Sequence, residues 1–174
     1  KKILSILFIC GSLLISCATV PADSKSKEVR KVKLSLVLSD TGDDVKNVVK
    51  KAFSNNFNVD ELSAEVDSLL EKYPFNGDLH EIAAMISVLR SQKGKAFYHY
   101  ATSALDLNYS GRTIALENID SMRLTYSERK TFIKVLELIT SLDKDHKTVA
   151  LARNILSHYY LNNGEIKKGY FQTE

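Results

Sequence analysis

The sequence is poor in the residues that punctuate or cross-link a chain. Its 174 residues include no tryptophan, two cysteines, two prolines and seven glycines. Two cysteines are too few for a disulfide-rich scaffold or a four-cysteine metal site, and scarce proline leaves room for long helices. The formal net charge of +3 is too small to indicate a nucleic-acid-binding protein, which usually carries a clearly basic stripe. A chain of this length suits one domain with a substantial core.

The N-terminal sixteen residues have the layout of a secretory signal peptide. Two lysines precede a mostly apolar run, residues 3–15, which is too short to span a bilayer as a helix, since that needs about 20 residues. The run ends in Leu-Ile-Ser-Cys at 14–17, which resembles the lipobox of bacterial lipoproteins. The resemblance implies removal of residues 1–16 and acylation of Cys17. The alternative is an ordinary signal peptide with a chance cysteine.

Removal of the signal peptide and acylation of Cys17 would change the net charge of the chain and the state of its two cysteines. Removing the two lysines lowers the net charge from +3 to +1. Cys10 would leave with the signal and Cys17 would carry lipid, so we expect no disulfide and no thiol chemistry. Two or three acyl chains anchor a protein firmly. The family's sorting rules place a lipoprotein with alanine after the cysteine, here Ala18, in the outer rather than the inner membrane of the cell envelope.

The segment after the lipobox predicts a tether followed by a lead-in. Residues 18–28 are small, polar and charged, and reach at most about 40 Å when extended. Residues 29–40 fit two patterns, because alternate apolar residues suit a strand and others suit a helix face. We expect a helix or an extended piece that covers the front of the helical domain. The predicted organisation is a signal peptide (1–16), a lipidated cysteine with tether and lead-in (17–42), and a helical domain (43–174).

From residue 43 onward the apolar residues recur with the helical period. The pattern predicts eight helices: one from Asp43, one between an Asp60 N-cap and Pro74, one from Asp78 to Gly94, then 95–107, 112–122, one capped by Thr125 and Glu128, 146–162 ended by Asn163-Gly164, and a short one after Glu165.

The helices are predicted to come in pairs at a constant spacing. The first helices of successive pairs begin near residues 43, 78, 112 and 146, which are 35, 34 and 34 residues apart. Helix–turn–helix units of this length resemble the tetratricopeptide repeat (TPR). The last unit matches best, because five of its residues fall where TPR has Leu, Gly, Tyr, Gly and Ala: Leu156, Ser157, Tyr160, Gly164 and Gly169. The resemblance implies an all-α solenoid of antiparallel helix pairs. An irregular α-helical bundle is the alternative.

Motifs for catalysis or metal binding are weak. Residues 40–42 read Asp-Thr-Gly, as in the catalytic loop of aspartic proteases, but the flanking Ser39 and Asp43 depart from that pattern. His80-Glu81 begins like the zinc motif H-E-x-x-H, but residue 84 is alanine. We interpret each histidine as a surface or interface residue, and we expect no enzymatic activity, no cofactor and no bound metal.

The TPR resemblance implies a binding groove, because the first helix of each pair lines the concave face of such arrays. It assigns the groove to the following residues: Glu81, Ala84, Val88 and Ser91 in the second unit, and Asn154, His158, Leu161 and Asn162 in the last. An asparagine amide both donates and accepts, so it can bond to the backbone of an extended peptide.

These patterns predict a membrane-anchored, TPR-like scaffold or adaptor that binds a protein or peptide partner in the cell envelope, and no nucleic acid. The alternative is a small-ligand-binding lipoprotein associated with a transporter, with the aromatic clusters at 97–100 and 158–160 lining its pocket. An open groove would favour the first hypothesis, and an enclosed cavity the second.

Overall fold

The computed structural model describes residues 31–54 and 57–172, and this part of the chain is all-α. The predicted signal peptide, Cys17 and the tether lie outside the described residues. The described helices are α1 (Asp43–Ala52), α2 (Val59–Lys72), α3 (Gly77–Leu89), α4 (Lys93–Ala104), α5 (Arg112–Ser121), α6 (Tyr126–Leu142), α7 (His146–Asn162) and α8 (Ile166–Phe171). None of them is both long enough and apolar enough to span a membrane.

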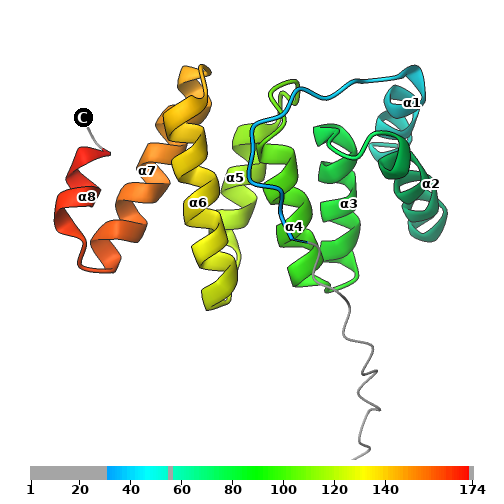
Figure 1. The fold of residues 1–174 in the computed structure, drawn as a ribbon. Coiled ribbons are helices and arrows are strands. Elements are labelled where there is room, and N and C mark those ends of the chain that lie inside the picture. The colour runs from blue at the N-terminus through cyan, green and yellow to red at the C-terminus, as the bar shows by residue number, and fades with distance from the viewer. Residues whose placement is uncertain (1–30, 55–56, 173–174) are drawn as a thin grey trace, which may run out of the picture.

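The helices from α3 to α8 stand side by side in chain order and alternate in direction (Figure 1). Contacts join α1 to α2 and α3, α2 to α3, α3 to α4, α4 to α5 and α6, α6 to α7, and α7 to α5 and α8. The predicted all-α class is therefore confirmed. The assignment to a TPR-like solenoid stays a prediction.

Two apolar clusters hold the helices together. The apolar stripes of α1, α2 and one face of α3 form one cluster, which includes Val48, Val66 and Ile82. A larger cluster runs from the middle of α3 to α7 and includes the fully buried side chains of Leu116 and Phe132. Burial of such stripes is the main source of stability for a helix that would be marginal alone.

Several predicted helix ends are confirmed. The side chain of Thr125 accepts the N–H of Glu128, and the Glu128 carboxylate accepts the N–H of Thr125, so α6 begins with a reciprocal capping box. The seventh helix has its predicted bounds, and Gly164 follows it with a φ of 77°, a conformation that favours glycine.

Other helix ends differ from the predictions. Asn58 and Asn76 cap α2 and α3 in place of the aspartates two residues later, because each amide oxygen accepts backbone N–H groups at the helix start. The third helix ends at Leu89, and Gly94 lies in the first turn of α4 instead of ending α3. The turn between them is made by Ser91, whose φ is 56°.

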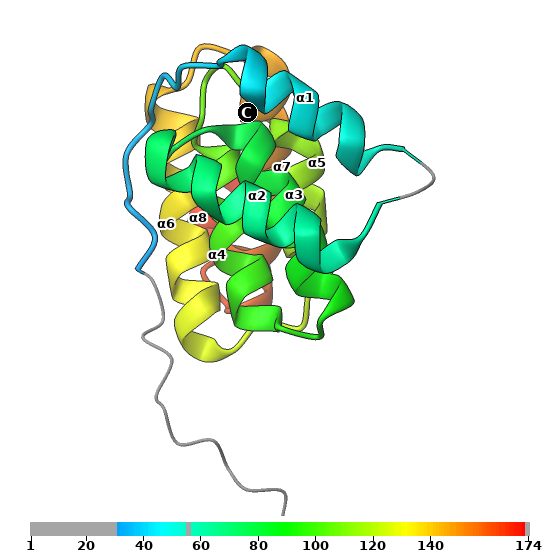
Figure 2. The ribbon, with the colours of Figure 1, turned by 90° about the vertical axis from the view of Figure 1, so that its right-hand side faces the viewer.

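The lead-in is extended, which resolves the ambiguity of its sequence pattern. The N–H of Val37 donates to the carbonyl oxygen of Leu105 at 3.0 Å, and the N–H of Leu107 donates to that of Val37 at 2.8 Å. Leu36 packs against the larger core cluster, whereas Leu38 is 73% exposed. The lead-in runs along one side of the helices (Figure 2), and no other strand-like pairing occurs within the described residues.

The buried carboxylate of Asp106 fastens the lead-in to two helix ends. It accepts the N–H of Gly77 at 2.8 Å, the N–H of Asn108 at 3.0 Å, and both the N–H (3.2 Å) and the hydroxyl of Ser39. Asp106 is 1% exposed, so these donors have little access to water. One side chain therefore fixes the start of α3, the turn after α4 and the lead-in relative to one another.

The ring of Tyr109 explains why residues 77 and 111 are glycines. A Cβ at Gly77 would lie 2.3 Å from the Cβ of Tyr109, and a Cβ at Gly111 would lie 2.2 Å from its hydroxyl oxygen. Neither distance is possible between real atoms, so both glycines are needed for the ring to reach its place between the starts of α3 and α5.

Candidate binding groove

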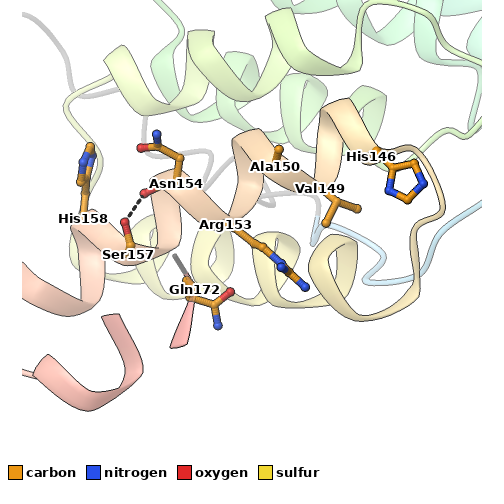
Figure 3. Close-up of a pocket in the computed structure, with 8 residues that line it drawn as sticks. All are labelled: His146, Val149, Ala150, Arg153, Asn154, Ser157, His158 and Gln172. Atoms are coloured by element: carbon orange, nitrogen blue, oxygen red, sulfur yellow. Dashed lines mark hydrogen bonds between the residues drawn. The ribbon is translucent and has the colours of Figure 1, made fainter. Parts of the chain in front are cut away.

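An open groove of about 600 Å³ follows one face of α7 (Figure 3). Its lining residues recur along the helix at spacings of three and four, which places them on one face. They are His146, Val149, Ala150, Arg153, Asn154, Ser157 and His158, together with Gln172 from the segment after α8.

The two histidines mark the ends of the groove. His146 is the first residue of α7, and His158 lies three turns later, near the other end of the lined face (Figure 3). Twelve residues of α-helix separate them by about 18 Å. That span matches an extended peptide of about five residues, at roughly 3.3 Å per residue.

The middle of the groove presents unused polar groups. Arg153 is exposed and forms no ion pair with another described residue. The side-chain amide of Asn154 is exposed too, while its backbone carbonyl accepts the hydroxyl of Ser157 at 2.7 Å. A guanidinium can bind a carboxylate through two parallel hydrogen bonds, and an amide can pair with a peptide group. The groove therefore offers one fixed positive charge beside one donor–acceptor pair.

An acidic side chain from α5 lies near one end of the groove. Burial raises the pKa of Asp120, and the charge of His158 lowers it in part. Asp120 is therefore a local counterpart of His158, and the single fixed positive charge of the groove is that of Arg153.

Two of the four residues predicted for the last unit line this groove. Asn154 and His158 line it, whereas Leu161 and Asn162 are exposed at the end of α7 but do not line it. Leu161 instead lies against α8, where a Cβ at Gly169 would be 2.7 Å from its Cγ. The prediction missed Arg153 and His146. Counting back from Asn154 by helical spacing would have found His146, and Arg153 precedes Asn154 directly.

The prediction for the second unit is wrong for two of its four residues. Ala84 is fully buried in the larger core cluster, and Glu81 is 9% exposed, so neither lines an open surface. Val88 and Ser91 are exposed, but they lie at the end of α3 and in the turn after it. The physical reason is that α4 packs closely against α3, so the middle of α3 is covered.

Glu81 is a buried carboxyl group whose two oxygens are not both hydrogen-bonded. Its Oε2 atom has no hydrogen-bond partner among the described residues. Burial raises its pKa to about 7, a hydrogen bond with Tyr109 lowers it in part, and the charge of Asp78 raises it further. Burial also raises the pKa of Tyr109 and of Tyr100, as does the charge of Glu81.

We expect the stability of the protein to fall as the pH rises from about 4.5 to about 7, because the folded state binds the Glu81 proton more tightly than the unfolded state does. In the parent protein the free energy of unfolding should be lower at high pH because of Glu81. In the Glu81→Gln variant this difference between low and high pH should shrink by about 1–3 kcal/mol. Urea unfolding at pH 5 and pH 8 measures the difference. The exposed Glu117→Gln serves as the control, and an unchanged pH profile in Glu81→Gln would contradict the assignment.

Two histidines, which the sequence left as surface or interface residues, form a buried pair between α3 and α4. His80 is 2% exposed and His99 is 8% exposed, and their Nδ1 atoms lie 2.9 Å apart. His80 also bonds through Nε2 to the carbonyl oxygen of Pro74 at 3.1 Å. In the neutral pair one Nδ1 donates and the other accepts. Throughout residues 31–54 and 57–172, no group of three or more His, Cys, Asp or Glu side chains is placed to hold a metal ion.

No protein family, curated protein or solved structure matches this chain. The fold defines an all-α protein with an open groove on α7.

Proposed function

We propose that this protein is a membrane-anchored lipoprotein whose TPR-like helical array binds a protein or peptide partner in the bacterial cell envelope. The observation that carries the proposal is the open groove on α7, with Arg153 and Asn154 at its middle. The lipobox-like sequence at 14–17 supports the anchor. Binding requires no cofactor and no catalysis. The lipid anchor would confine the protein to one surface and raise its effective concentration toward partners in the same membrane.

The shape of the groove supports an extended segment of polypeptide as the ligand. A groove of about 18 Å open to solvent holds several residues of a strand. Asn154 would pair with the backbone of that segment, and Arg153 would pair with a carboxylate from an acidic side chain or a chain terminus. The partner class is therefore a peptide or exposed protein segment that carries at least one negative charge.

The alternative, a small-ligand-binding lipoprotein associated with a transporter, has less support. It needs an enclosed apolar cavity, and the groove on α7 is open. The aromatic residues that would line such a cavity serve other purposes. Phe97, Tyr100 and Tyr160 are buried within the larger core cluster, where they pack against other helices.

Substitutions in the groove test this proposal. We expect the combined Arg153→Ala and Asn154→Ala variant to lose about tenfold or more in partner recovery after crosslinking in intact cells, because each anchor in an interface typically carries about 1–2 kcal/mol. Adding His158→Ala should extend the loss. The matched control is Lys134→Ala on α6, which is exposed and lies outside the groove. Undiminished partner recovery with the groove variants would show that the groove on α7 does not bind the partner.

A further inference from the structure

The molecule is electrically polarised along its helix axes. The α3–α4 and α5–α6 turns lie at one end of the array, and the α4–α5 and α6–α7 turns lie at the other (Figure 1). Segments 89–95 and 122–130 form the first end, named the basic end, and contain six basic residues and one acidic residue. Segments 105–111 and 142–147 at the opposite end contain three aspartates and two lysines. The small net charge of the chain conceals this separation.

The turns of the basic end are neighbours in space. The α4 and α6 helices contact each other, and a Cβ at Gly94 would lie 3.6 Å from the carboxylate of Glu128. That carboxylate is engaged in the capping box with Thr125, and a second carboxylate at this end, that of Asp60 from α2, forms an ion pair with Arg90. The Lys93, Lys95 and Lys130 ammonium groups form no ion pair with another described residue.

Exposed apolar and aromatic side chains accompany these charges. Leu89 is 64% exposed and Tyr126 is 76% exposed. The ammonium group of Lys130 lies 5.4 Å from the centre of the Tyr126 ring. A surface that combines cations, an aliphatic side chain and a tyrosine has the chemistry of the interfacial region of a membrane protein.

The lysines of α4 stand where helix electrostatics disfavours them. Lys93 and Lys95 lie in the first turn of α4, which has no acidic residue, although the N-terminal end of a helix dipole is positive. The first turns of α1 and α2 carry acidic residues, whereas those of α5 and α7, like that of α4, carry none. No carboxylate of the described residues pairs with Lys93 or Lys95, so both ammonium groups are available to an external anion.

We propose that the basic end docks on an anionic lipid bilayer, with its cations at the headgroup phosphates and with Leu89 and Tyr126 in the interface. This inference rests on the membrane anchor of the proposed function. The described chain begins at Lys31, fourteen positions after Cys17, and an extended chain covers that interval in at most about 50 Å. The anchor thus holds the domain within reach of the bilayer. Because α7, like its neighbours, runs between the two ends at which the turns lie (Figure 1), the groove would then stand upright on the membrane with its His158 end nearer the lipid.

Single tryptophans test this orientation, because the sequence has none of its own. Tyr126→Trp and Leu142→Trp place exposed reporters at the first and last residues of α6, about 24 Å apart. The full chain is bound to vesicles of phosphatidylglycerol and phosphatidylethanolamine that contain brominated lipid. We expect quenching and a shift of emission to shorter wavelength for Tyr126→Trp, and neither change for Leu142→Trp.

Charge variants complete the test. Adding Lys93→Gln and Lys95→Gln to Tyr126→Trp should weaken docking of the basic end about tenfold, seen as loss of quenching while the chain stays on the vesicles. Equal quenching at both positions, or none at residue 126 in vesicle-bound protein, would overturn the proposed orientation while leaving the anchor in place. Failure of the full chain to sediment with vesicles would overturn both the anchor and the docking.

Discussion

Asp106→Ala is expected to destabilise the protein by about 3–5 kcal/mol, because three backbone N–H groups and one hydroxyl would lose their shared acceptor in a buried site. For a domain of this size the midpoint of thermal unfolding should fall by roughly 8–15 °C. Asp106→Asn keeps one carbonyl oxygen and should cost less. Circular dichroism during thermal and urea unfolding measures both variants.

The lead-in gives this prediction a second readout. Ser39 depends on Asp106 for two of its hydrogen bonds, so the Asp106→Ala variant should release the lead-in before the helices unfold. Trypsin should then cleave after Lys31 and Lys33 faster than in the parent protein. The exposed Asp67→Ala on α2 is the control. Parent-like unfolding and cleavage in Asp106→Ala would show that Asp106 does not hold these segments together.

Arg112→Met is expected to cost a similar amount, about 3–5 kcal/mol, because it leaves a buried carboxylate unpaired. The guanidinium of Arg112 forms an ion pair with Asp143, and these side chains are 5% and 2% exposed. It also donates through Nε to the carbonyl oxygen of Ala104 at 2.9 Å. The pair joins the start of α5 to the end of α6 and thus helps to position α7. Urea unfolding measures the loss.

A double variant separates the lost pairing from lost packing. If the stranded charge causes the instability, Arg112→Met combined with Asp143→Asn should recover part of the stability lost in Arg112→Met alone. The surface pair of Lys46 and Asp43 is the matched comparison, and Lys46→Met should leave stability unchanged within error because both groups are solvated. Strictly additive losses at Arg112 and Asp143 would argue against a buried ion pair of this importance.

Helix positions were predictable where the determinants are local. The Thr125–Glu128 capping box and the Asn163-Gly164 end of α7 depend on residues within one turn, and both were found. The α3–α4 turn was misplaced because glycine was expected to end α3, whereas Ser91 adopts the left-handed conformation and Gln92 donates its N–H to Ser87. An ordinary residue in this conformation gives no sequence signal.

Features that depend on distant contacts were not predictable. The Asp106 network joins residues up to 67 positions apart, and the Tyr109 ring lies against two glycines whose spacing gives no hint of it. The same limit explains the groove. The helical period of α7 places Asn154 and His158 on one face, so their positions could be predicted. The burial of Ala84 and Glu81 depends on how α4 and Tyr109 cover α3, which the sequence pattern of α3 does not show.

The most direct test of the central claim is site-specific photocrosslinking from the groove in intact cells. A photoreactive residue at Asn154 should yield one reproducible crosslinked partner, whereas the same residue at the exposed Lys134 on α6 should yield none above background. Arg153→Ala should weaken the Asn154 crosslink. An identical crosslinking pattern from both positions, or a partner captured only from Lys134, would contradict the assignment of the α7 groove as the binding site.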